Sequence, residues 1–89
     1  MIVCKRVTYT GRVQGVGFRY TVSGLARGFG VAGTVRNCPD GSVELIVQGE
    51  ETEVKAFMNA IARRMEGYVQ DQMVQDIVAC PMQGFHITR

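Results

Sequence analysis

A glycine-rich segment near the N-terminus, residues 11–19, has the composition of a loop that binds an anion through its backbone. It runs Gly-Arg-Val-Gln-Gly-Val-Gly-Phe-Arg, with glycines at positions 11, 15 and 17. Glycine takes positive φ angles at little steric cost, so such a loop can turn several N–H groups toward one point. A helical apolar pattern follows directly, and its first N–H groups and dipole would add to the same concavity. The segment predicts a backbone cradle for a phosphate group.

Arg19 closes this segment and is the first candidate catalytic residue. A guanidinium forms two parallel hydrogen bonds to phosphate oxygens, each contributing roughly 1.5–3 kcal/mol, and lysine cannot reproduce that geometry. The spacing matches neither the nucleotide P-loop nor the dinucleotide fingerprint, so no nucleotide is predicted. The alternative is that the glycines form only a tight strand-to-helix turn and that Arg19 is a solvated surface residue. Spacing alone leaves both readings open.

A second segment of interest ends in Asn37. It runs Gly-Thr-Val-Arg-Asn over residues 33–37, and Asp-Gly-Ser-Val-Glu follows over residues 40–44. The first segment resembles, nearly residue for residue, the N-terminal signature of the acylphosphatase family, and the second resembles that family's other signature. The resemblance covers essentially the whole chain, including the order of elements, the separation of the motifs and the similar ending at residues 85–87. It implies hydrolysis of the carboxyl–phosphate bond of acyl phosphates.

The resemblance also implies roles for individual residues. Arg19 would bind the phosphate, and Asn37 would position the attacking water. In some bacterial relatives a cysteine of the first strand is bridged to one of the third. Cys4 holds the first of these positions, but Gln48 holds the second, so that bridge cannot form here. The backbone amides of the cradle would come from four loop residues: Gly15, Val16, Gly17 and Phe18.

This small set of residues suits one kind of leaving group. The carboxylate released from an acyl phosphate has a pKa of roughly 4 and needs no proton in order to leave. Neither motif places a His, Asp or Glu near the scissile bond, so an alkoxide leaving group would lack a general acid. Asn37 is no general base, but its amide oxygen can hold a water in line with the phosphorus. Without the family resemblance, Asn37 could equally be a hairpin residue ahead of Pro39.

Periodicity indicates the elements that must position these residues. Apolar residues alternate in the strand patterns and recur at spacings of three and four in the helix patterns, with Thr52 as the expected cap of the second helix. The order predicts a ferredoxin-like α+β fold, with an antiparallel sheet, two helices on one face and a short extra C-terminal strand. We expect residues 1–89 to form one domain. The predicted elements are a strand at 3–13, a helix at 18–29, strands at 31–37 and 42–48, a helix from 52 to 67, and strands at 69–79 and 85–88.

Composition limits the partners and cofactors. Ten Lys and Arg residues against eight Asp and Glu residues give a formal net charge of only +2, too weak to indicate nucleic acid. No apolar run approaches the roughly 20 residues of a membrane span. Three cysteines without metal-type spacing and a single histidine suggest neither a metal nor another cofactor. We therefore expect a cytoplasmic protein, taken as a monomer, and the partner that the family resemblance implies is a small acyl phosphate.

The fold alone does not select an enzyme, so two binding modules remain as alternatives. An RNA-binding sheet would display clustered aromatic residues, whereas Tyr9 and Phe85 both fall in the apolar phase of their strands. A noncatalytic or regulatory phosphate-binding module would need only the loop and Arg19. Asn37 therefore separates hydrolysis from binding. His86 alternates with apolar neighbours in the last strand, so we expect it on the surface.

Overall fold

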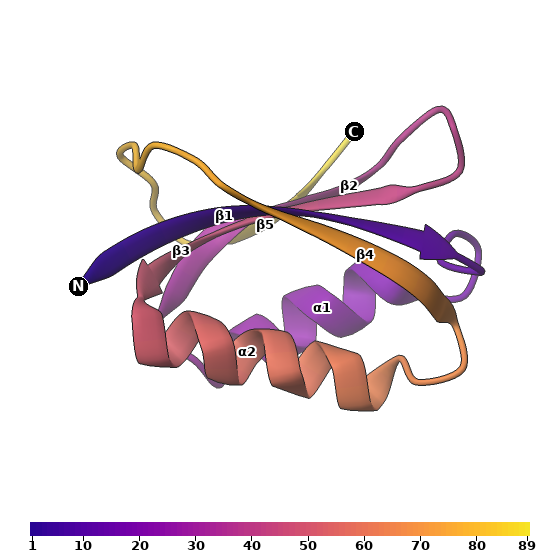
Figure 1. The fold of residues 1–89 in the computed structure, drawn as a ribbon, viewed down its shortest axis with the longest axis horizontal. Coiled ribbons are helices and arrows are strands. Elements are labelled where there is room, and N and C mark those ends of the chain that lie inside the picture. The colour runs from indigo at the N-terminus through magenta and orange to yellow at the C-terminus, as the bar shows by residue number, and fades with distance from the viewer.

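Residues 1–89 are all described by the computed structural model. The chain runs β-α-β-β-α-β and then adds a short strand, which confirms the predicted order of elements. Both helices cover one face of a single sheet (Figure 1), as expected for a ferredoxin-like α+β fold. The elements are β1 (Ile2–Gly11), α1 (Phe18–Ala26), β2 (Val31–Asn37), β3 (Val43–Glu50), α2 (Glu51–Arg64), β4 (Val69–Asp76) and β5 (Phe85–Thr88).

The strands lie in the order β4-β1-β3-β2-β5. Three of the pairings, β4 with β1, β1 with β3 and β3 with β2, are antiparallel. The predicted extra strand β5 departs from this pattern, because it pairs in parallel with β2 and makes the sheet mixed. The chain leaves β4 at one edge of the sheet and returns at the opposite edge, where it runs in the same direction as β2. A parallel pair requires such a crossing connection.

The connection between β4 and β5, residues 77–84, bonds in turn to the strands that it passes. Its first N–H donates to the carbonyl of Cys4 on β1 at 3.0 Å. The Gln48 side chain on β3 accepts from the N–H of Cys80 at 3.0 Å and donates to its carbonyl at 2.9 Å. The carbonyl of its last residue accepts from the N–H of Gly33 on β2 at 3.0 Å. These bonds fix the path of the connection to the far edge.

The core lies between the sheet and the two helices. The alternation predicted for β3 is confirmed, because Val43, Leu45 and Val47 are all fully buried. Burying each such side chain contributes roughly 1.5–3 kcal/mol, so the alternation determines which face of the sheet meets the helices. The core cluster consists of Val7, Tyr9, Val13, Phe18, Val22, Ala26, Val35, Val43, Leu45, Val47, Val54, Phe57, Ile61 and Met65.

Several predicted boundaries were wrong. Thr52 does not cap α2: the helix begins at Glu51, Thr52 is an exposed residue of its first turn, and no side chain caps the N-terminus. The carboxylates of Glu51 and Glu53 in that first turn instead complement the helix dipole. The first helix ends at Ala26, three residues before its apolar pattern does. Phe29, the last apolar residue of that pattern, packs on the core from a turn, so the apolar contacts extend beyond the helical backbone.

Candidate active site

The loop between β1 and α1 takes the backbone conformation expected of its glycines. Gly15 has φ 77° and Gly17 has φ 78°, and Gly17 holds the left-handed conformation directly before the first residue of α1. A Cβ atom built at either position would meet nothing within 4 Å. Glycine is therefore required here by the backbone angle and not by lack of space.

The backbone N–H groups of this loop have no acceptor within the protein. None of those from Gly15 to Arg19 donates a hydrogen bond to another part of the chain. No side chain caps α1, and no acidic residue lies in its first turn. The first N–H groups of a helix and the positive end of its dipole favour an anion. The predicted cradle thus presents donors that nothing in the chain neutralises.

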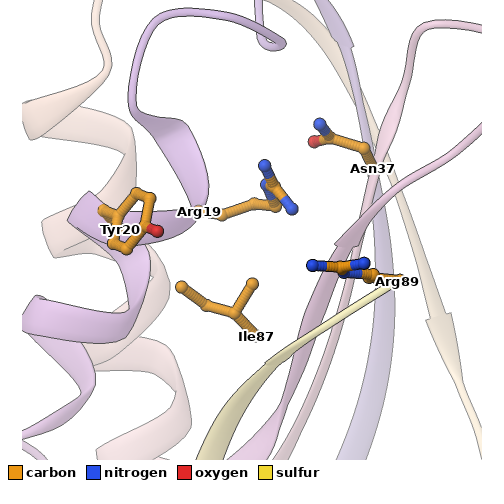
Figure 2. Close-up of a pocket in the computed structure, with 5 residues that line it drawn as sticks. All are labelled: Arg19, Tyr20, Asn37, Ile87 and Arg89. Atoms are coloured by element: carbon orange, nitrogen blue, oxygen red, sulfur yellow. The ribbon is translucent and has the colours of Figure 1, made fainter.

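A pocket of about 600 Å³ opens beside the start of α1, and it contains both predicted catalytic residues. Figure 2 shows the side chains of Arg19, Asn37 and Arg89 directed toward one shared space. Tyr20 and Ile87 complete the lining. The four residues predicted to supply amides are not among the lining residues, although their loop leads directly into Arg19. The structure therefore brings the Arg19 guanidinium and the Asn37 side-chain amide into one pocket. The glycine-rich loop directly precedes Arg19 in the chain.

The sheet determines where Asn37 lies. Asn37 is the last residue of β2 and is paired with Val43 on β3. It shares a strand face with the fully buried Val35, so its side chain points to the side of the sheet that the helices cover. On the other side of β2, Val35 is paired with Ile87 of β5. Continuing this register by two residues brings Arg89 beside Asn37.

The turn that follows Asn37 is held by a network of hydrogen bonds. The Asp40 carboxylate accepts from the N–H of Ser42 at 3.0 Å and from its hydroxyl at 2.6 Å, and these bonds lower the pKa of Asp40. The N–H of Cys38 donates to the carbonyl of Ser42 at 2.8 Å. The side-chain amide of Gln14 donates to the carbonyls of Cys38 and Ser42, both at 2.8 Å. Gln14 thereby joins the glycine-rich loop to this turn.

The positive charges of the pocket have no partner in the chain. Arg19 and Arg89 form no salt bridge, whereas Arg36, directly before Asn37, is bound to Glu44 at 3.0 Å. The bond to Glu44 raises the pKa of Arg36. The pocket lining includes no carboxylate side chain. Two guanidinium groups can therefore bind an anion there without first breaking an ion pair.

Comparison with known proteins agrees with this geometry. A family model described as Acylphosphatase matches residues 5–87. The chain belongs to the acylphosphatase family. The acylphosphatase of Methanospirillum hungatei JF-1 is 38% identical, over an alignment that covers 96% of this chain and 98% of that protein. The crystal structure of acylphosphatase from Bacillus subtilis has a TM-score of 0.89 and 34% identity, and the alignment covers both chains completely.

Other acylphosphatases match over a shorter segment at higher identity. The acylphosphatase of Bifidobacterium longum NCC 2705 is 52% identical over 61 residues, which is 68% of this chain and 63% of that protein. The acylphosphatase of Lactobacillus gasseri is also 52% identical, over 57% of its own length. The chain thus spans about three fifths of the length of these two relatives.

Sequence reasoning missed three residues that line the pocket of this acylphosphatase family member: Tyr20, Ile87 and Arg89. Alternation places Ile87 and Arg89 on the same face of the last strand, and that was the available signal. The neighbour of the last strand was not predictable, so nothing linked this face to Asn37. Tyr20 follows Arg19 on α1 and is 76% exposed, which gave no sign of a pocket.

The remaining groups fall outside this site. His86 is exposed, as expected. No three His, Cys, Asp or Glu side chains gather where they could hold a metal ion. Neither helix has the length and apolar character needed to cross a membrane.

Proposed function

We propose that this protein hydrolyses small acyl phosphates to a carboxylate and inorganic phosphate. The observation that carries the proposal is that one pocket holds both Arg19 and Asn37, next to a helix N-terminus with free N–H groups. Phosphoryl transfer depends mainly on positioning and on stabilising charge on the phosphate oxygens. Membership of the acylphosphatase family supports the same reaction.

Arg19 and the amides of residues 15–18 hold the phosphate in this proposal. The guanidinium forms two charge-assisted hydrogen bonds to phosphate oxygens, and the amides bind the charge that develops on the remaining oxygen. Because no acid caps α1, the helix dipole acts on the phosphate without competition. We propose that the reaction needs no metal ion or cofactor, since these groups supply the positive charge.

Asn37 positions the water that attacks. Its amide oxygen accepts a hydrogen bond from the water and holds it opposite the leaving group. The water oxygen forms a bond to phosphorus while the bond from phosphorus to the acyl oxygen breaks, and the proton of the water passes to solvent. None of the five lining residues has a carboxylate, imidazole or thiol side chain, the usual general acids and bases near neutral pH. The substrate must therefore release a weakly basic group, as a carboxylate is.

Hydrolysis of benzoyl phosphate in the presence of EDTA tests the proposal. We expect the unaltered protein to release phosphate and Asn37→Ala to lose on the order of 100-fold in kcat. Inorganic phosphate should inhibit both proteins equally well, because Arg19 and the loop remain. Asn59→Ala is a matched control, since Asn59 is exposed on α2.

The outcomes separate hydrolysis from binding. A protein that binds phosphate but releases none from benzoyl phosphate would be a noncatalytic module, and loss of activity in EDTA would show that a metal is needed. An RNA-binding module is disfavoured because Tyr9 and Phe85, the two aromatic residues of the strands, pack in or against the core. Binding of RNA at micromolar concentrations would reverse that judgement.

We also propose that residues 1–89 act as one domain, as a monomer in the cytoplasm. One core cluster spans both helices and the sheet, which supports a single folding unit. The three cysteines are free thiols, as a reducing compartment would keep them. Light scattering would test the monomer, and fractionation of cells would test the compartment.

A further inference from the structure

Gln14 lies in the glycine-rich loop but has no part in the proposed chemistry. It is partly buried, and its side-chain nitrogen donates to two carbonyls of the turn that follows Asn37. The loop carries the donors for phosphate, and the turn adjoins the residue that positions water. These two halves of the site lie on segments far apart in the sequence, and the Gln14 side chain connects them directly.

We infer that Gln14 is a positioning residue that sets the distance between the phosphate cradle and Asn37. The inference rests on the proposed function. In-line attack requires the water oxygen and the phosphorus to lie about 3–3.5 Å apart, so a small shift of one half relative to the other slows the reaction. Gly15 and Gly17 contribute no side-chain contacts that could hold the loop in place, and the space around their Cβ positions is open. The two bonds from Gln14 restrain the loop against the turn.

The turn does not need Gln14 in order to form. The carbonyl of Ser42 also accepts from the N–H of Cys38 at 2.8 Å, and the carbonyl of Cys38 accepts from the N–H of Gly41 at 3.1 Å. Removing the Gln14 amide therefore leaves neither carbonyl without a partner. Val13 and Phe18, on either side of the loop, stay anchored in the core. A variant without the amide should fold.

The test compares Gln14→Met with Gln72→Met. Methionine keeps the length of the side chain and removes its donors, and Gln72 is an exposed residue of β4. We expect Gln14→Met to lose roughly 10- to 100-fold in kcat on benzoyl phosphate, while inhibition by inorganic phosphate stays within about twofold. Gln72→Met should match the unaltered protein. An equal kcat for the two variants, or a loss of phosphate inhibition in Gln14→Met, would overturn the inference.

A double-mutant cycle distinguishes positioning from general weakening of the fold. If Gln14 acts through Asn37, Gln14→Met should reduce kcat by less than about twofold in the Asn37→Ala background. The same large loss in both backgrounds would show a merely structural role. A protein with no turnover before any substitution would refute the proposed function, whereas full turnover in Gln14→Met would refute only this inference.

A separate observation concerns Cys4 and Cys80. Cys4 lies on β1 one residue out of phase with Val7 and Tyr9, so it points away from the helices. It is nevertheless only 3% exposed, because the connection of residues 77–84 passes over this face.

Cys80 lies over the same face of the sheet as Cys4. Cys4 is paired with Gln48 on β3, and the Gln48 side chain holds both backbone polar groups of Cys80. Paired residues point to the same face of the sheet, so Gln48 holds Cys80 over the face to which Cys4 points. A disulfide spans about 4.4–6.8 Å between Cα atoms. Burial, with a smaller contribution from the charge of Cys80, raises the pKa of Cys4.

We propose that Cys4 and Cys80 are a modification site, where a disulfide forms when a low-molecular-weight disulfide is present. The thiolate of exposed Cys80 attacks oxidised glutathione and releases one glutathione thiolate. The thiol of Cys4 then loses its proton and attacks the Cys80 sulfur, which expels the second glutathione. Two protein thiols are oxidised while one glutathione disulfide is reduced to two thiols.

Mass spectrometry of the full chain after incubation with oxidised glutathione tests this proposal. We expect the loss of two hydrogens, a linked peptide that contains Cys4 and Cys80, and a raised unfolding midpoint that reductant reverses. Cys38→Ser should behave in the same way, and Cys80→Ser should show neither change. A glutathione adduct that persists on Cys80, a link through Cys38, or a disulfide-linked dimer would overturn the proposal.

Discussion

Arg19 and Arg89 both supply positive charge to the pocket, but their geometry decides what each can do. Arg19 belongs to the first turn of α1, next to the loop donors, so its planar fork can meet two oxygens of one phosphate. Arg89 reaches the same space from beyond β5. The shape of the guanidinium, as well as its charge, should therefore matter at position 19.

Arg19→Lys keeps the charge and removes the fork. We expect the loss of one charge-assisted hydrogen bond, roughly 1.5–3 kcal/mol of transition-state stabilisation, which is a fall of about 10- to 150-fold in kcat/KM. Steady-state hydrolysis of benzoyl phosphate measures it. The control is Arg63→Lys, because Arg63 is exposed on α2. Unchanged kcat/KM in Arg19→Lys would mean that charge alone suffices.

The Tyr9 hydroxyl is buried without a hydrogen-bond partner. Burial raises the pKa of Tyr9 well above its usual value. A buried unsatisfied group costs about 1–3 kcal/mol, so Tyr9→Phe should raise the free energy of unfolding by about 1 kcal/mol or more. Urea unfolding measures the change, and Tyr68→Phe, on the surface, should change little. A decrease would show that the hydroxyl has a bound water as partner.

The role of a site residue could be predicted where it depends only on neighbouring positions in the sequence. The glycines at positions 15 and 17, and Arg19 directly after them, could be assigned from neighbouring positions in the sequence. Asn37 needed the family resemblance, because an asparagine ahead of a turn has an ordinary structural reading. Arg89 was missed because its role depends on which strand lies beside β5. No local pattern contains that information.

At the scale of elements, the start of α1 combines the site with a backbone conformation that favours glycine. Gly17 precedes the helix in the left-handed conformation, and no side chain caps it. A residue with a Cβ atom would adopt this conformation at a cost of about 1–2 kcal/mol. Stability and the shape of the cradle depend on the same glycine.

We expect Gly17→Ala to lower the free energy of unfolding by about 1–2 kcal/mol and Gly17→Asn to lower it less, since asparagine tolerates this region. Gly24, inside α1 and with open space around its Cβ position, provides the control. Gly24→Ala should stabilise by about 0.5–1 kcal/mol, because alanine favours a helix interior. Denaturant titration of the three variants measures these opposite signs, and destabilisation by both alanines would contradict the conformational argument.

Periodicity predicted the existence and type of all seven elements, but not all of their ends. Helical and alternating patterns report burial, and burial continues past Ala26 into a turn that still packs on the core. The start of α2 was misplaced for a related reason, since the first turn is fixed by strand β3 ending at Glu50 and not by a capping hydroxyl. The parallel pairing of β5 depends on a connection with no periodic pattern of its own.

At the scale of the whole molecule, the site should couple anion binding to stability. A ligand that binds the folded state alone raises the free energy of unfolding, by about 2.7 kcal/mol at 100 times its dissociation constant. The unpaired guanidinium groups and free N–H groups are assembled only in the folded chain, so inorganic phosphate should stabilise it.

We expect inorganic phosphate to raise Tm of the unaltered protein in a saturable way and to raise Tm of Arg19→Ala much less. Calorimetry at constant ionic strength measures the shift, with chloride as the control for screening. Equal shifts in both proteins would show that phosphate acts on the solvent or at another place on the surface.

Strand β5 has four residues, pairs with β2 alone and carries one wall of the pocket on Ile87. Its partner β2 is distant in the sequence, so the chain between them forms a long loop. Closing that loop is favourable only after β1, β3 and β2 have formed. We expect β5 to be unformed in the folding transition state, so Ile87→Ala should speed unfolding and leave the refolding rate nearly unchanged. Stopped-flow kinetics would show this, and slower refolding would contradict it. The order of assembly would then make the pocket the last part of the molecule to form and the first to open.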